Sequence, residues 1–130
     1  MARGYSREHT SVHLLNYHFV WCPKYRKKIL KEDIKNRLEE LIQEKAEELE
    51  LEILELSIQP DHVHLFIEGS PKLSPNKIIQ QIKGYTSREL NKDFEFTQLP
   101  SLWTRSYFVS SAGNVSNETI QKYIEEQTGV

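Results

Sequence analysis

The sequence predicts a single α+β domain in which strands and helices follow the order β-α-β-β-α-β-α. Residues 11–22 are rich in β-branched and aromatic side chains, which favours a strand. Residues 31–49 repeat apolar side chains at helical spacing. Residues 51–68 contain two apolar stretches separated by a short connection, which is typical of an antiparallel hairpin. At 130 residues, the chain is long enough to bury the core of one domain.

The N-terminal part is expected to contain an arm, a strand and a basic loop. Residues 1–10 are polar, lack the apolar core of a signal peptide, and are expected to form a mobile arm. The first strand, residues 11–22, ends at Pro23. The loop that follows carries a basic patch next to the aromatic residues Tyr25 and Trp21: Lys24, Arg26, Lys27, Lys28 and Lys31. That combination suits a nucleic-acid backbone with stacked bases, although a solvated turn before a helix has the same composition.

The first helix is expected to carry the acidic residues of the chain on its outer face. One stripe is apolar and faces a core: Ile34, Leu38, Leu41, Ile42 and Leu49. Ten of the 19 acidic residues lie in residues 32–55, against three of the 17 basic residues. The net charge of −2 therefore conceals a basic remainder, while the glutamates themselves indicate a solvated helix face.

The hairpin contains the most informative pattern in the chain. The apolar phase changes within residues 51–58, which indicates a β-bulge or a strand buried on both faces. In residues 60–68, aliphatic residues alternate with His62 and His64, so both imidazoles leave the sheet on one side. They would lie roughly 6.5–7 Å apart along the strand, close enough to share one metal ion. A structural histidine pair has the same local pattern.

The C-terminal half is expected to contain a helix, a strand and a helix. Ser74 and Pro75 suit the N-cap and first position of a helix that ends near Leu90. Gly84 inside it costs about 1 kcal/mol relative to Ala. After a loop over residues 91–101, residues 102–110 are expected to form the fourth strand. A last helix would span residues 117–127, capped by Ser116.

The first six elements match the ferredoxin-like βαββαβ arrangement, an antiparallel sheet with helices on one face and here an added C-terminal helix. The single cysteine, Cys22, excludes an internal disulfide and gives no sign of a cysteine zinc site. No apolar run is long enough to span a membrane. A cytoplasmic location follows as the expectation.

Three stretches of the chain resemble one known family. Asp61-His62-Val63-His64-Leu65 is similar to the HUH motif, in which a bulky apolar residue separates two histidines. Tyr123-x-x-x-Gln127, following Leu102-Trp103-Thr104-Arg105-Ser106-Tyr107, resembles the single-tyrosine (Y1) transposases of the IS200/IS605 type. Trp21-Cys22-Pro23-Lys24-Tyr25-Arg26 is similar to that family's segment after its first strand. The resemblance covers residues 11–127, with the motifs in the family's order.

The resemblance implies a metal-dependent transposase that cuts and rejoins single-stranded DNA at insertion-sequence ends through a 5′-phosphotyrosine intermediate. Tyr123 would be the catalytic nucleophile, and His62, His64 and Gln127 would bind Mg²⁺ or Mn²⁺. It also implies recognition of DNA hairpins near the element ends. The implied assembly is a homodimer in which the tyrosine helix of one subunit serves the histidine pair of the other. We expect phosphate contacts from five basic residues: Lys24, Arg26, Lys27, Lys28 and Arg105.

Two other functions are compatible with the residues themselves. A metal-dependent phosphodiester hydrolase could use His62 and His64 with water as the nucleophile, and it would form no covalent DNA adduct. A non-catalytic ferredoxin-like nucleic-acid-binding domain would stack bases on its sheet and would need neither histidine.

Overall fold

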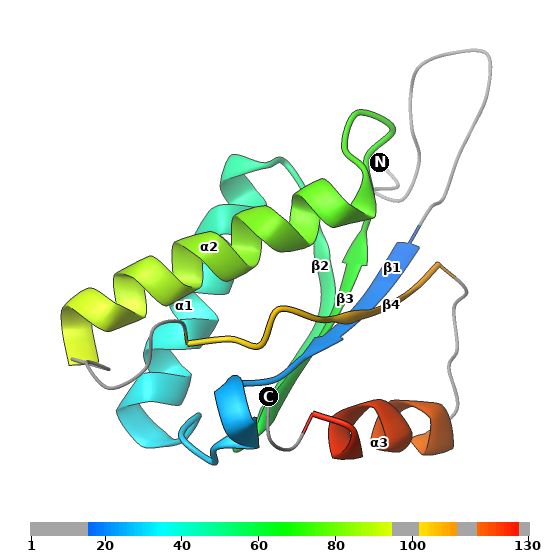
Figure 1. Cartoon of the computed structure of the whole chain (residues 1–130). Coiled ribbons are helices and arrows are strands. Elements are labelled where there is room, and N and C mark those ends of the chain that lie inside the picture. Colours follow the sequence, from blue (N-terminus) through cyan, green and yellow to red (C-terminus); the bar gives the residue numbers. More distant parts are fainter. Residues whose placement is uncertain (1–15, 95–101, 112–116, 128–130) are drawn as a thin grey trace.

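The computed structural model describes residues 16–94, 102–111 and 117–127 (Figure 1). In these ranges the strands form one antiparallel sheet in the order β2-β3-β1-β4. This order is that of the ferredoxin-like arrangement, so the predicted α+β class is confirmed. The elements in chain order are β1 (Asn16–Trp21), the 3₁₀ turn η1 (Lys24–Arg26), α1 (Glu32–Glu48), β2 (Ile53–Gln59), β3 (His62–Glu68), α2 (Pro75–Phe94), β4 (Phe108–Ser110) and α3 (Asn117–Glu125).

One face of the sheet forms the main core with α1 and α2. Because side chains alternate across a strand, β3 directs Val63, Leu65 and Ile67 to this face, and all three are fully buried. Phe19 and Trp21 of β1 join the same cluster. Figure 1 shows α1 and α2 side by side against the sheet, with α3 apart from them.

The opposite face of the sheet carries a second, smaller apolar cluster. Val20 of β1 and Cys22, which follows the end of β1, are buried there against Ile124 of α3, with Phe108 and Tyr123 packed beside them. Val20 pairs directly with His64 of β3 and with Phe108 of β4. The added C-terminal helix therefore covers the face of the sheet from which the histidines project.

The change of phase predicted in the second strand is a β-bulge. The register between β2 and β3 shifts between Ile53, which pairs with Ile67, and Glu55, which pairs with Phe66. Leu54 is the extra residue, and it is 45% exposed. The bulge lets the strand change which residues face the core without breaking its pairing to β3.

The second helix begins as predicted but ends later. The backbone N–H of Lys77 donates to Ser74 Oγ at 3.2 Å, which confirms the N-cap. The predicted end near Leu90 is wrong, because helix continues to Phe94. Leu90 is fully buried, and Asp93 accepts a 2.9 Å hydrogen bond from Arg37 of α1, so contacts with α1 stabilise the extra turn.

The predicted fourth strand over residues 102–110 is also wrong for most of its length, because β4 spans only Phe108–Ser110. The backbone of the segment before β4 forms its hydrogen bonds with other partners. Lys83 Nζ of α2 donates to the carbonyl oxygens of Thr104, Arg105 and Ser106 at 2.7, 3.4 and 3.0 Å. The Thr104 N–H donates to the Cys22 carbonyl at 3.0 Å. A helix side chain thus takes the acceptors that a strand would have used in a ladder.

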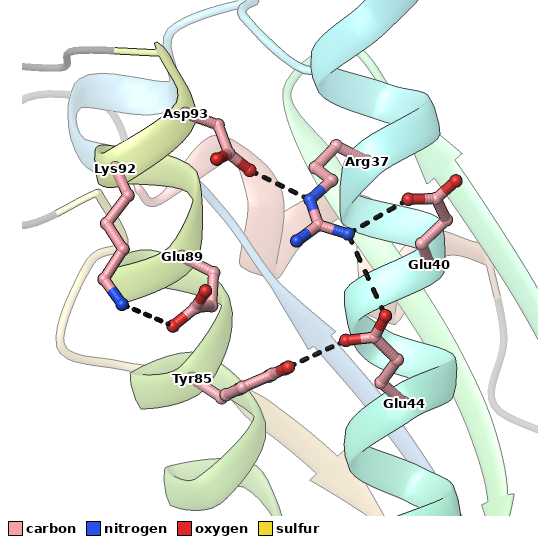
Figure 2. A network of polar contacts seen from close by, with 7 residues as sticks. All are labelled: Arg37, Glu40, Glu44, Tyr85, Glu89, Lys92 and Asp93. Carbon is pink, nitrogen blue, oxygen red and sulfur yellow. Dashed lines mark hydrogen bonds and ion pairs between the residues drawn. The ribbon is translucent and has the colours of Figure 1, made fainter.

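The acidic face of α1 is partly paired with α2 rather than wholly solvated (Figure 2). Arg37 bridges the helices, with Nε 2.9 Å from Asp93 and Nη1 3.1 Å from Glu40. Tyr85 of α2 donates its hydroxyl to Glu44 at 2.7 Å. These contacts lie at the rim of the helix pair, above the apolar contacts of the main core.

Some predictions fall outside the described residues. They are the arm over residues 1–10, the beginning of the first strand at residues 11–15, and the Ser116 cap. Among the described helices, none combines the length and the apolar composition needed to cross a membrane.

Candidate active site

The two histidines of β3 lie against one another on the sheet face that α3 covers. Their ring centroids are 4.8 Å apart and the ring planes are nearly perpendicular, at 78°. Both are half-buried, whereas the three aliphatic residues of the same strand are fully buried on the other face. The predicted projection of both imidazoles from one side is confirmed.

Asp61 orients the first histidine. Its Oδ1 lies 2.7 Å from His62 Nδ1, so we assign the proton to Nδ1, which donates to the carboxylate. The lone pair of His62 is then on Nε2, directed away from Asp61. A carboxylate in this position is the usual partner of a metal-binding imidazole, because it fixes both the tautomer and the ring orientation.

A third histidine, His18 of β1, lies beside the pair and was missed by the sequence prediction. Its Nε2 is 3.4 Å from His64 Nδ1, a long hydrogen bond, and the ring centroids are 5.5 Å apart. The contact follows from the β1–β3 register, in which His18 and His64 lie diagonally opposite. The signal for it was the alternation within β1, which becomes readable once the pairing of the two strands is known.

The electrostatics of this cluster favour the neutral form of His64 and His18. Burial, and after it the positive charge of His62 and His18, lower the pKa of His64 to about 4. Burial also lowers the pKa of His18 from its ordinary value, with Glu55 acting in the opposite direction. A neutral imidazole has a free lone pair, so at neutral pH His64 can act as a metal ligand.

The donor set fits a divalent cation with an incomplete protein shell. His62 and His64 converge and offer nitrogen atoms, with Asp61 behind the first. In the described part of the chain, no three His, Cys, Asp or Glu side chains are arranged to hold a metal ion. The pair would therefore supply two ligands and leave the remaining positions open to an amide oxygen, substrate or water.

Tyr123 lies on the same face of the sheet, carried there by α3. Its ring packs on Phe108, with centroids 6.1 Å apart, and its hydroxyl is 3.3 Å from Ser106 Oγ. Burial raises the pKa of Tyr123 to about 12, with its hydrogen bond to Ser106 acting in the opposite direction. In this arrangement the phenol remains protonated at neutral pH.

Ser106 also holds Gln127. The Ser106 hydroxyl donates to Gln127 Oε1 at 2.7 Å, and Gln127 Nε2 donates to the Tyr123 carbonyl at 3.3 Å. The structure thus brings Tyr123 and Gln127 together through a serine that the sequence prediction did not single out. Among the described residues, no hydrogen bond joins Tyr123 or Gln127 to His62 or His64.

The predicted basic residues divide into exposed and internally bonded side chains. Lys27, Lys28 and Arg105 are exposed. Arg26 instead bridges two parts of the site, with Nε 3.4 Å from Asp61 Oδ2 and Nη1 donating to the Ile124 carbonyl at 3.3 Å.

The two aromatic residues of this segment differ in their exposure. Trp21 is fully buried in the main core, so the expectation that it could stack on bases is wrong. Tyr25 is 52% exposed and has a positive φ of 59°. Of these two rings, Tyr25 is the one that remains accessible to a ligand.

Comparison with known proteins assigns the family. The family of IS200-like transposases matches residues 11–127. The ISDra2 transposase TnpA of Deinococcus radiodurans is 30% identical over 96% of this chain and 88% of its own length. A transposase for the insertion sequence IS200 of Salmonella typhimurium is 29% identical over 85% of this chain and 75% of its own.

Solved structures agree with this assignment. A crystal structure assigned to a transposase of D. radiodurans R1 superimposes with a TM-score of 0.85 at 30% identity, covering 96% of this chain and 99% of that one. A REP-associated tyrosine transposase bound to a REP hairpin shares the fold, with a TM-score of 0.59 at 13% identity, covering 92% of this chain and 68% of that one. The chain therefore belongs to the IS200-like (Y1, HUH) transposases, enzymes that cleave and transfer DNA.

Proposed function

We propose that this transposase cuts and rejoins single-stranded DNA at the ends of its insertion sequence, with Tyr123 as the nucleophile. The observation that carries the proposal is the position of α3, which packs on the sheet face from which His62 and His64 project. A tyrosine hydroxyl and a pair of metal-binding imidazoles on one face are the two parts that such a reaction requires.

The proposed chemical step transfers a phosphoryl group to the tyrosine. The Tyr123 oxygen attacks the scissile phosphorus and loses its proton, forming a 5′-phosphotyrosyl bond as the bond to the neighbouring 3′ oxygen breaks. The released 3′ oxygen takes up a proton and becomes a free 3′-OH. A 3′-OH can later attack the phosphotyrosyl bond and restore a phosphodiester, so joining needs no external energy source.

The tyrosine needs activation for this step, because burial raises its pKa to about 12. Ser106 Oγ, at 3.3 Å, is positioned to hold the phenol before it engages DNA. Rotation or displacement of α3 would release the phenol from Ser106 and return it to solvent, where its pKa falls toward the ordinary value near 10.

We further propose that His62 and His64 bind Mg²⁺ or Mn²⁺, with Gln127 as a third ligand. The bound cation would polarise a non-bridging phosphate oxygen and offset the charge that develops there. Asp61 holds His62 in the tautomer that this role requires, and His64 is neutral at working pH. Gln127 would have to exchange its 2.7 Å contact with Ser106 for the metal, so its contribution should be smaller than that of either histidine.

A homodimer with shared sites remains part of the proposal. Within one chain, the described contacts of Tyr123 and Gln127 are with Ser106 and Phe108 rather than with the histidines. This supports an active site in which the tyrosine helix of one subunit serves the histidine pair of another. The REP-associated relative is bound to a DNA hairpin, which supports hairpins at the element ends as the DNA partner.

The DNA contacts proposed from the sequence need one adjustment. Lys24, Lys27, Lys28 and Arg105 remain available as phosphate contacts, whereas Arg26 is engaged by Asp61 and α3 and would contact DNA only on leaving them. We also propose that residues 1–130, including the arm, form one domain and that the protein acts in the cytoplasm.

The decisive experiment mixes the protein with labelled single-stranded DNA from its own element's ends and Mn²⁺ or Mg²⁺. We expect a slowly migrating product on a denaturing gel that disappears with chelator and in Tyr123→Phe. Because the phenol is the nucleophile, Tyr123→Phe should lose cleavage by more than a thousandfold while binding DNA as tightly as the parent.

Other outcomes would replace the proposal. Cleavage that persists in Tyr123→Phe, without a covalent product, would identify a hydrolase that uses water. Tight binding without cleavage, unaffected by His62→Ala and His64→Ala, would identify a binding domain. The histidine variants should keep their fold, since both side chains project away from the main core.

A further inference from the structure

A cationic cavity lies away from the histidines, between α2, η1 and the segment that precedes β4. Its volume is about 500 Å³, which is the size of a site for a nucleotide-sized ligand. Four of its lining residues are basic and, among the described residues that line it, none is acidic. The lining comprises Lys24, Lys83, Gly84, Ser87, Arg88, Trp103, Thr104 and Arg105.

Gly84 belongs to the lining of this cavity. It lies within α2, where glycine weakens a helix, yet a Cβ built on it would meet no atom within 4 Å. No contact inside the described chain therefore requires glycine at this position. A glycine that packing does not explain, on the wall of a cavity, is typical of a place where a ligand approaches the backbone closely.

The basic residues of the cavity are held to different degrees. Lys83 is fixed by the carbonyl oxygens of Thr104, Arg105 and Ser106, and burial lowers its pKa to about 8, so it remains charged at neutral pH. Arg88 is exposed, and its contacts are long: Nε lies 3.9 Å from Glu89 Oε2, and Cζ lies 5.9 Å from the centroid of the Tyr85 ring. One fixed charge and adjustable arginines around the opening of the cavity suit a phosphate group.

We propose that this cavity binds the phosphodiester backbone of the DNA strand, with Gly84 allowing its close approach and Arg88 and Arg105 contacting phosphate oxygens. The inference rests on the proposed action on single-stranded DNA and adds a binding site outside the histidine and tyrosine cluster. Lys83 contacts the backbone carbonyl of Ser106, and the hydroxyl of the same serine contacts Tyr123. DNA in the cavity would therefore lie next to the tyrosine helix.

The test is a DNA-binding measurement by fluorescence anisotropy, with chelator present so that no cleavage occurs. Gly84→Glu places bulk and negative charge in the cavity, and we expect it to weaken binding by about tenfold or more. Arg88→Gln should weaken binding and reduce the slope of log affinity against log salt by about 0.7–0.9, the value for one lost phosphate contact. Gly84→Ala, which adds only a methyl group, should fall between Gly84→Glu and the parent.

The matched control is Gln43→Glu, which introduces the same charge on the exposed face of α1. It should bind DNA within about twofold of the parent if the effect of Gly84→Glu is local rather than a change of net charge. Circular dichroism of each variant establishes that α2 is intact. Should Gly84→Glu unfold, Arg88→Gln and Gly84→Ala still decide the question.

Two results would overturn the inference. One is parent-like affinity and salt slope in both Gly84→Glu and Arg88→Gln. The other is a cavity for free phosphate, in which inorganic phosphate at fixed ionic strength raises the unfolding temperature of the parent but not of Gly84→Glu, while DNA affinity is the same in both. Failure of the proposed function has a different signature, the absence of the Tyr123 adduct, which leaves these affinities unaffected.

Discussion

Asp61 connects the histidine strand to the C-terminal helix. One carboxylate oxygen lies 2.7 Å from His62 Nδ1, and the other lies 3.4 Å from Arg26 Nε. Arg26 in turn donates to the Ile124 carbonyl in α3. A single acidic residue therefore orients one proposed metal ligand and is linked through Arg26 to the helix that carries Tyr123.

Replacing Asp61 should weaken metal binding without removing a ligand. Asp61→Asn leaves His62 in place but loses the charged partner that fixes its tautomer, so we expect about 10–100-fold weaker Mn²⁺ affinity. Isothermal titration calorimetry measures it directly. The control is Asp93→Asn, which changes an equivalent charge in the α1–α2 network and should bind Mn²⁺ like the parent. Equal Mn²⁺ affinities in the parent and Asp61→Asn would show that His62 does not need Asp61 to hold its orientation.

The buried His64 should make the metal-free protein sensitive to acid. Its pKa falls from 6.5 to about 4 on folding, so between these pH values the unfolded chain binds a proton that the folded chain does not. The stability linked to this group is fully present above pH 6.5 and is lost as pH falls toward 4. Urea unfolding across this range should show a smaller loss in His64→Gln. Parallel pH profiles would contradict the assignment.

Local patterns in the sequence predicted two placements. The shared face of His62 and His64 follows from alternation within one strand, and the shared stripe of Tyr123 and Gln127 follows from their spacing in the predicted last helix, while the roles of these residues come from the resemblance to the family. His18 and Ser106 escaped prediction because their contacts join residues 46 and 17 positions apart. The orienting role of Asp61 depends on a side-chain rotamer, which spacing does not encode.

At the scale of elements, local patterns predicted the helices and the hairpin well and the last strand poorly. The cap at Ser74 and the bulge after Ile53 were both readable, because each depends on residues close in sequence. The segment before β4 has strand composition, but Lys83 from another element takes its carbonyl groups. Strand composition indicates what a segment can form, while its hydrogen-bond partners decide what it does form.

The α1–α2 pair offers a comparison of polar and apolar contributions to stability. Arg37 is partly exposed at the centre of the network in Figure 2, so Arg37→Ala should lower the free energy of unfolding by about 1 kcal/mol or less. Ile79 is fully buried in the same helix pair, so Ile79→Ala should cost about 2–5 kcal/mol. Urea unfolding of both variants measures the difference. Equal losses in the free energy of unfolding would show that the ion pairs stabilise the α1–α2 interface as much as its apolar contacts do.

At the scale of the whole molecule, the two apolar clusters are unequal. The main core contains the sheet's inner face with α1 and α2, whereas α3 is held by the small cluster around Val20, Cys22 and Ile124. The fold could be predicted from the order of elements. The docking of α3 on the histidine face could not, because it depends on which strands become neighbours.

A chain ending at Ser111 should therefore remain folded without α3. Burial of Ile124 is worth roughly 1.5–3 kcal/mol, so we expect a loss of about that size in the free energy of unfolding, with the cooperative transition retained. Urea unfolding followed by fluorescence reports on Trp21 and Trp103, both in the main core. Ile124→Ala should reproduce much of this loss of stability. A truncated chain that unfolds without a cooperative transition would contradict the conclusion that the main core folds independently of α3.

The small cluster under α3 also bears on how two copies could exchange their tyrosine helices. Six residues connect β4 to α3, so each chain presents its own α3 to the surface formed by Val20 and Cys22 at a local concentration on the order of millimolar. A helix arriving from a separate molecule at micromolar concentration would lose that competition. Exchange therefore requires that the two chains already be held together by another surface, which would present the foreign helix at a comparable local concentration.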